Sequence, residues 1–190
     1  MTSHYDSALF LRHTDKGTIL LFLYVDDMII TGDDLIDIQE LKDFLSQQFE
    51  MKDLGHLNYF LGLEITYSID GLYITQAKYA SELLYRAGLT DSKFVDTPVE
   101  LNMHLTSTKG KSLSNPSLYR CLVGSLIYLT VTRPDISYAI HQVSQYLSAP
   151  RSTHYAAILR ILRYLKGTLF HGLFYYAQSP LVLRAFSDVD

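Results

Sequence analysis

The chain has 190 residues, of which 48% are hydrophobic and 19% are charged, with ten Gly and five Pro. These proportions exclude a disordered, collagen-like or low-complexity chain and supply enough apolar side chains for one domain or two small ones. The single cysteine, Cys121, excludes an intrachain disulfide. The longest apolar stretch, residues 19–25, is far shorter than the ~20 residues of a membrane span, and no basic segment precedes it. We therefore expect no membrane span and no signal peptide, and a location in the cytoplasm or nucleus.

Charge is divided unevenly along the chain. Residues 1–70 hold 13 Asp and Glu against four Lys and Arg, whereas residues 71–190 hold 12 Lys and Arg against seven Asp and Glu. No acidic residue occurs between residues 136 and 187. An acidic N-terminal part followed by a basic C-terminal part would suit a cation-dependent site beside a groove that binds a polyanion. Ordinary solvated surface explains the same division of charge.

The first 90 residues predict an α+β arrangement of hairpins and helices. Residues 18–25 and 28–31 are β-prone runs on either side of Asp26 and Asp27, so these two carboxylates are expected at a hairpin bend. A helix is expected next, because Asp34 can cap it and apolar residues recur at helical spacing as far as Phe49. The other elements of this part are a short apolar run over residues 8–12, a strand-like run over residues 57–67, a turn at Asp70-Gly71, a returning strand over residues 72–75 and a helix over residues 76–87.

The second half of the chain is predicted to be mainly helical. Residues 91–117 lack periodicity and are rich in Ser, Thr, Lys and Pro, which predicts a linker or crossing segment and the best domain boundary. Arg160, Arg163 and Lys166 are expected on one face of the last helix, opposite its apolar face. The predicted elements are helices over residues 118–132, 135–148 and 153–166, the last capped by Thr153, and short strands over residues 172–176 and 181–186.

Adjacent carboxylates between two apolar strands repel each other, and a divalent cation removes this conflict. Mg²⁺ prefers oxygen ligands and is commonly held by one or two carboxylates together with substrate phosphates. Taken alone, the pair is explained better by an exposed, Asp-rich turn, so the surrounding sequence decides between the two interpretations.

The pair belongs to the motif Tyr24-Val25-Asp26-Asp27, within residues 23–32. This motif resembles the metal-binding palm hairpin of reverse transcriptases and, more narrowly, that of the polymerase region of copia-type retrotransposon Pol polyproteins. Further blocks follow in the family's order and extend the resemblance over almost the whole chain: residues 57–65, 76–79, 97–98, 119–120, 124–129, 132–136 and 163–168.

The resemblance implies that Asp26 and Asp27 are two catalytic carboxylates of the polymerase and ligands of Mg²⁺, with Asp26 the more direct ligand. It also implies that Tyr24 lies near the primer terminus, although packing within the strand explains this tyrosine equally well. The hairpin of residues 57–65 and 72–75 would lie against the primer backbone. In the full enzyme, the partners would be an RNA or DNA primer–template duplex and a deoxynucleoside triphosphate.

The resemblance further implies a division of the chain into parts. Residues 1–90 would be part of a palm and the start of a thumb, residues 91–117 a linker-like crossing segment, and residues 118–180 a helical, connection-like region. Residues 181–190 would be the first strand of an RNase H domain, with Asp188 as its first catalytic, metal-binding carboxylate. Arg160, Arg163 and Lys166 would contact duplex phosphates, although a solvated helix face explains the same pattern.

Two parts of the family's pattern have no counterpart in the sequence. The 25 residues before Asp26 match neither the third catalytic carboxylate, expected on an earlier strand, nor the block that contacts the incoming nucleotide. We therefore expect a fragment of a retrotransposon RNA-directed DNA polymerase that is inactive without the missing upstream segments. The alternatives are a non-catalytic nucleic-acid-binding remnant and an unrelated acidic α+β protein that holds a cation with Asp26 and Asp27.

Overall fold

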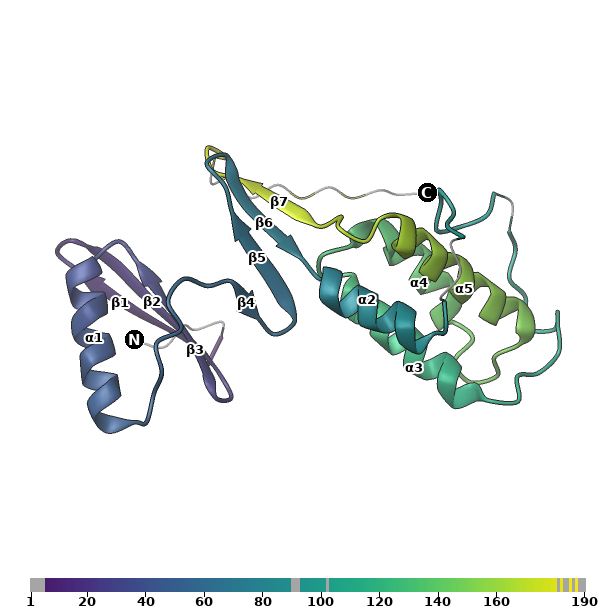
Figure 1. The fold of residues 1–190 in the computed structure, drawn as a ribbon, viewed down its shortest axis with the longest axis horizontal. Helices are drawn as coiled ribbons and strands as arrows, with labels where there is room; N and C mark the ends of the chain where they lie inside the picture. The colour runs from purple at the N-terminus through teal and green to yellow at the C-terminus, as the bar shows by residue number, and fades with distance from the viewer. Residues whose placement is uncertain are drawn as a thin grey trace. The chain divides into compact units, whose positions relative to one another are not determined.

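The computed structural model describes residues 6–89, 93–101 and 103–180 and the single residues 182, 185 and 187. Helices and antiparallel sheets are both present, so the predicted α+β class is confirmed. The chain divides into two units, Met1–Leu57 and Asn58–Asp190 (Figure 1). None of the described helices is long and apolar enough to cross a membrane.

The first unit is a three-stranded antiparallel sheet with one helix. Its strands are β1 (Leu9–Thr14), β2 (Gly17–Tyr24) and β3 (Asp27–Gly32), in that order across the sheet. Helix α1 (Leu35–Gln48) follows and contacts β3. The hairpin and the helix predicted for this part of the chain are therefore confirmed.

Asp34 fixes where α1 begins. Its carboxylate accepts a hydrogen bond from the backbone N–H of Asp37 at 3.2 Å and another from the hydroxyl of Thr14 at 2.9 Å. These two bonds, the backbone bond foremost, hold the pKa of Asp34 below its ordinary value. Because Thr14 lies at the end of β1, the predicted N-cap also ties the helix to the sheet.

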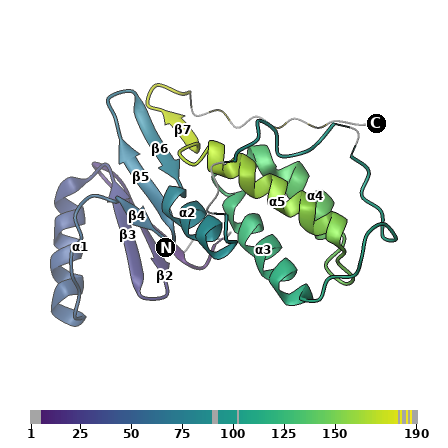
Figure 2. The same ribbon diagram turned by 45° about the vertical axis from the view of Figure 1, so that its right-hand side comes forward.

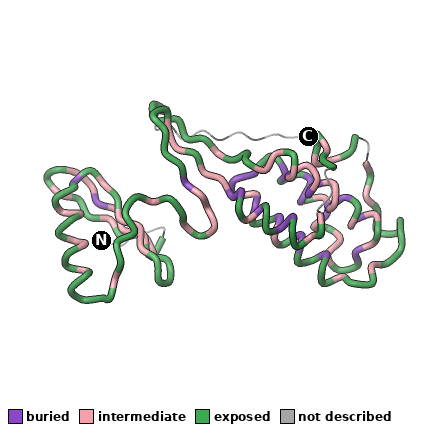
Figure 3. Tube along the Cα trace, in the orientation of Figure 1, coloured by how far each residue is buried: buried purple, intermediate pink, exposed green. Residues whose placement is uncertain are grey.

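The described part of the first unit has little core of its own. Ile19 is its one buried apolar side chain, and α1 buries none of its residues. Figure 3 shows buried positions concentrated in the helices of the second unit instead. Several large apolar side chains of the first unit are mostly exposed: Val25, Leu35, Ile36, Phe44, Phe49 and Leu54.

The second unit begins with a sheet whose last strand comes from far along the chain. The antiparallel order is β4 (Tyr59–Phe60), β5 (Leu63–Tyr67), β6 (Gly71–Thr75) and β7 (Leu173–Tyr176). Strand β7 pairs with β6, with Leu173 opposite Ile74. The strand expected over residues 57–67 is broken by a two-residue turn at Leu61 and Gly62, which have φ values of +49° and +80°.

Four helices form the core of the second unit (Figure 2). They are α2 (Ala77–Arg86), α3 (Pro116–Leu129), α4 (Ser137–Ser144), which follows the 3₁₀ turn η1 (Pro134–Ile136), and α5 (Ser152–Gly167). The residues expected on the apolar face of α5 are all fully buried: Ile158, Ile161, Leu162 and Leu165. The last helix is capped differently from the expectation: Arg151 is its N-cap, and Nδ1 of His154 accepts the backbone N–H of Arg151 at 3.1 Å.

The expected boundary at residues 91–117 differs from the observed one. The described residues of this segment pack onto the helices: Leu105 accepts a hydrogen bond from Tyr146, and Ser112 pairs with Arg151 in an isolated β-bridge. Apolar side chains of the segment cover the helical core, among them Val99, Met103, Leu105 and Leu113. The segment lacks a hydrophobic period because these apolar side chains pack against the helices and do not form one face of a helix or strand of their own.

Candidate functional site: a carboxylate bend and a basic helix

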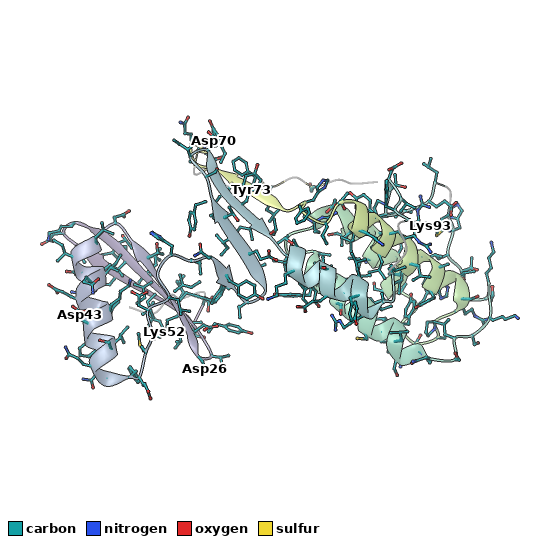
Figure 4. The ribbon with its side chains drawn as sticks, in the orientation of Figure 1. Asp26, Asp43, Lys52, Asp70, Tyr73 and Lys93 are labelled. Atoms are coloured by element: carbon teal, nitrogen blue, oxygen red, sulfur yellow. The ribbon has the colours of Figure 1, made fainter. Side chains whose placement is uncertain are left out.

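Asp26 and Asp27 lie at the bend that joins β2 to β3, as Figure 4 shows for the labelled Asp26. Tyr24 pairs with Asp27 across the hairpin, so Val25 and Asp26 make a two-residue loop. The structure thus brings together Tyr24, Asp26 and Asp27, the three residues expected near the polymerase centre. All three are exposed, Tyr24 to 47%.

The bend holds Val25 in an unfavourable backbone conformation. Its φ is +52°, a region that costs a residue with a side chain about 1–2 kcal/mol and suits a β-branched residue least. Val25 is 79% exposed, so packing does not repay this cost. The hairpin register maintains the strained bend, and the bend presents the Asp26 carboxylate beyond the ends of both strands.

The two carboxylates offer a set of oxygen ligands. None of the ion pairs found among the described residues involves Asp26 or Asp27. Two adjacent, solvated negative charges on a rigid bend fit a hard divalent cation that keeps water or substrate oxygens as its other ligands. No group of three or more potential metal ligands occurs in the described part of the chain.

The three cations expected to face a duplex are partly covered. Arg160, Arg163 and Lys166 are half-buried on α5, and their contact with a duplex stays a prediction. Arg160 Nη2 donates to the Thr97 hydroxyl at 2.9 Å, and Lys166 Nζ donates to the Leu89 carbonyl at 3.2 Å. These two cations therefore hold the preceding chain against α5.

Arg133, another cation of the second half of the chain, is buried. Its side chain is 4% exposed and forms a bidentate ion pair with Asp135, with Nε–Oδ1 and Nη2–Oδ2 distances of 2.9 and 2.7 Å. It also donates to the backbone carbonyl and the hydroxyl of Thr168. This arginine therefore ties η1 to the end of α5.

Two further residues of the matched blocks hold the fold together and were missed by sequence reasoning. Glu64 Oε1 accepts the backbone N–H of Lys78 at 2.6 Å and so caps α2, whose own N-cap makes no side-chain bond. The Tyr128 hydroxyl donates to the carbonyl of Leu61 in the β4–β5 turn. No local sequence pattern predicts these two contacts, because their partners are 14 and 67 residues apart in the sequence.

Asp188 and most of the strand expected over residues 181–186 lie outside the described residues. The RNase H carboxylate therefore stays a prediction from the sequence. The carboxylate bend belongs to the first unit, whereas the basic helix belongs to the second.

Comparison with known proteins decides the family. Residues 2–101 match the family model described as reverse transcriptase (RNA-dependent DNA polymerase). The chain belongs to the reverse transcriptase family. Within it, the chain is a region of copia-type retrotransposon Pol polyproteins, as the sequence resemblance implied. This membership excludes the alternative of an unrelated acidic protein.

The relatives of this reverse transcriptase region differ greatly in length. It is 42% identical to the retrovirus-related Pol polyprotein from transposon RE2 of Arabidopsis thaliana over 97% of the chain, and 38% identical to that from transposon TNT 1-94 of Nicotiana tabacum over 95%. The chain spans only 13% and 14% of those proteins. It is also 44% identical to the uncharacterized mitochondrial protein AtMg00810 of Arabidopsis thaliana, over 90% of the chain and 70% of that protein. No solved structure matches the chain.

Proposed function

We propose that Asp26 and Asp27 are two of the catalytic carboxylates of a reverse transcriptase, and that the rest of the site comes from other segments of a Pol polyprotein. The single observation that carries this proposal is the position of both residues at an exposed hairpin bend, within the residues that match the reverse transcriptase family. The strained Val25 supports it, since strain of this kind concentrates at functional sites.

The bend would hold Mg²⁺ through the carboxylate oxygens of Asp26 and Asp27. Bound there, the ion would supply positive charge that stabilises the entering and leaving oxygens in nucleotidyl transfer. Tyr24 is the cross-strand partner of Asp27 and is 47% exposed, so its ring would be accessible to a primer terminus beside the carboxylates. The protein's own contribution is to fix the carboxylates on a hairpin and to present an aromatic surface next to them.

The second unit would hold the primer and connect to later domains. The β4–β5–β6 hairpins, held to α3 by Tyr128, are proposed to support the primer backbone. We further propose that residues 1–90 form part of the palm with the start of the thumb and that residues 118–180 form the connection-like region. The assignment of Asp188 to an RNase H strand belongs to the same proposal.

Residues 1–190 alone are proposed not to extend a primer. A polymerase centre needs a third carboxylate, and the described residues gather no third acidic ligand at the bend. Losing one element of such a constellation typically costs about 10²–10³-fold or more in rate.

Primer extension tests both statements. The purified 190 residues, Mg²⁺, a primer–template and deoxynucleoside triphosphates are expected to give no more product than the Asp26→Asn, Asp27→Asn variant. In a longer Pol polyprotein that includes this region, the same double substitution is expected to lower extension at least about 10²-fold. Two exposed carboxylates outside the bend, Asp15 and Asp70, offer a charge-matched control: Asp15→Asn with Asp70→Asn should leave extension unchanged. Equal activity of the two double variants would disprove the catalytic assignment.

A second candidate function is nucleic-acid binding without catalysis. The observation that favours it is the match to AtMg00810, which shows a region of this kind making up most of a much shorter protein than a Pol polyprotein. Salt-dependent binding of a primer–template duplex by the 190 residues would support this function. No binding at low salt would exclude it.

A further inference from the structure

Residues 93–97, here called the 93–97 segment, lie across the basic face of α5. At one end, a Cβ atom added to Gly167 would lie 3.3 Å from Cβ of Phe94, so the segment approaches the helix closely there. At the other end, Arg160 donates to the Thr97 hydroxyl at 2.9 Å. Lys93, labelled in Figure 4, begins the segment.

Between these two contacts the segment and the helix leave an open cavity of about 430 Å³. Its described lining consists of Lys93, Phe94, Val95 and Arg163, so among the described residues two cations and no acid face the cavity. Asp96 follows in sequence but does not line it. A depression with this lining has a positive potential, which favours an anionic ligand.

Arg163 has a buried Nε atom with no hydrogen-bond partner among the described residues, and the same is true of Arg160. None of the ion pairs in that part of the chain involves Arg163 either. Arg160 and Lys166, by contrast, each donate a hydrogen bond to the chain that covers them. Arg163 is thus a positioned guanidinium whose charge is not used by the described fold.

Phe94 adds an aromatic surface to the same cavity. Its Cβ is held against Gly167, while 65% of the residue is exposed. An exposed ring beside two cations is the combination that binds nucleotides without base pairing, because a base stacks on the ring while its phosphate meets the cations. A paired base has no free face to offer such a ring, so the cavity favours an unpaired nucleotide.

We propose that Lys93, Phe94 and Arg163 form a binding site for a nucleoside phosphate, taken from an unpaired stretch of DNA or RNA. Arg163 and Lys93 contact the phosphate, and Phe94 stacks on the base. Arg160 and Lys166 are positioning residues that hold the surrounding chain in place. The site deepens the proposed nucleic-acid binding of this region and rests on it, but it does not depend on the carboxylates of the first unit.

Fluorescence anisotropy with a labelled 12-nucleotide single-stranded DNA tests the site in the whole 190-residue chain. Three competitors are added in turn: a duplex of the same sequence, free AMP and inorganic phosphate. They show whether the site prefers a nucleotide in a single strand, a nucleotide in a duplex, a free nucleotide or phosphate alone. The wild-type chain is expected to bind the single strand more tightly than the duplex. The slope of log affinity against log salt should fall by about 0.7 in Arg163→Ala, because one phosphate contact is lost.

Three variants and a matched control define the expected pattern. Arg163→Ala is expected to weaken single-strand binding about tenfold, and Arg163→Lys to weaken it less. Phe94→Leu is expected to weaken it about tenfold with an unchanged salt slope, because it removes stacking and no charge. Lys109 is an exposed cation near the other end of α5. Its substitution Lys109→Ala removes the same charge and should have little effect on single-strand binding. Circular dichroism of every variant confirms that it is folded.

Several outcomes would overturn the site. They are absence of single-strand binding by the wild type at 50 mM salt, equal loss in Arg163→Ala and Lys109→Ala, and unchanged binding in Phe94→Leu. Preference for the duplex would assign the cations to backbone contacts of paired nucleic acid and would likewise reject the stacking site. The Asp26→Asn, Asp27→Asn variant separates the two proposals. It should bind the single strand normally, although it is expected to lower primer extension at least about 10²-fold in the longer polyprotein.

Discussion

Arg133 and Asp135 form a bidentate ion pair in which the arginine is almost fully buried and the aspartate is 37% exposed. The hydroxyl of Tyr164 donates to the same Asp135 carboxylate at 2.8 Å, and the guanidinium lies 5.6 Å from the centre of the Tyr164 ring. With the two bonds to Thr168, the arginine closes a network that joins η1 to the C-terminal end of α5. A conspicuous arginine of the basic second half is thus a structural residue.

Arg133→Ala is expected to destabilise the chain by about 3 kcal/mol, because it leaves a partly buried carboxylate and the Thr168 acceptor without their partner. Arg133→Lys should cost about half as much, since one ammonium cannot reproduce the bidentate geometry. Urea unfolding followed by circular dichroism measures both. Arg86 is an exposed arginine at the end of α2 and provides the matched control. Arg86→Ala should change the free energy of unfolding by less than about 0.5 kcal/mol. A similar loss in both alanine variants would contradict the network.

The stability of the second unit is expected to fall in acid through Asp135. Burial acts most strongly on this carboxyl and raises its pKa, but the hydrogen bonds from Arg133 and Tyr164 and the charge of Arg133 together outweigh burial and lower the pKa. A lowered folded pKa gives stability above the unfolded value of about 3.9, and this stability is lost as the pH falls through the folded value.

Asp135→Asn should therefore be less stable than the wild type at pH 7, and the difference should shrink as the pH falls below about 4. Urea midpoints measured by helical circular dichroism between pH 7 and pH 3 give this difference directly. Asp34→Asn provides the comparison, because its pKa is also lowered but it belongs to the first unit. Parallel curves for the wild type and Asp135→Asn would show that the ion pair contributes no pH dependence.

Features whose partners are close in sequence could be predicted. The β2–β3 hairpin and its acidic bend follow from two apolar runs only two residues apart, and the Asp34 cap bonds to a backbone N–H three residues on. The apolar face of α5 follows from helical spacing alone. For the same reason the amino-acid sequence was sufficient to place the candidate carboxylates at the bend.

Features that depend on distant partners could not be predicted. Arg133 meets Thr168 across 35 residues, and β7 pairs with β6 across about 100 residues within one unit. The basic face of α5 illustrates the consequence for function. Helical periodicity correctly grouped its cations. Only tertiary packing shows that the 93–97 segment accepts a hydrogen bond from Arg160 and leaves Arg163 lining a cavity.

The β4–β5 turn should depend on glycine at position 62. Gly62 has a φ of +80°, and a Cβ atom added there would lie 2.9 Å from the Tyr128 hydroxyl oxygen. Gly62→Ala is therefore expected to cost about 1–2 kcal/mol from backbone strain together with a further cost from this close approach. In a Tyr128→Phe background the second part disappears, so the same substitution should cost less. A double-mutant cycle by urea unfolding measures the difference, and strict additivity of the two changes would contradict the contact.

Relaxing the strained bend should stabilise the hairpin that carries the carboxylates. Asn tolerates the left-handed conformation that Val25 adopts at φ +52°, and it is favoured in two-residue hairpin loops. Val25→Asn is expected to stabilise β2 and β3 by about 1 kcal/mol, measured as slower hydrogen exchange of their backbone amides. Thr31→Asn, at an exposed position inside β3, introduces the same side chain into extended backbone and should destabilise the hairpin by up to about 1 kcal/mol. If both asparagines shifted hydrogen exchange in the same direction, the backbone conformation at Val25 would not be the source of strain.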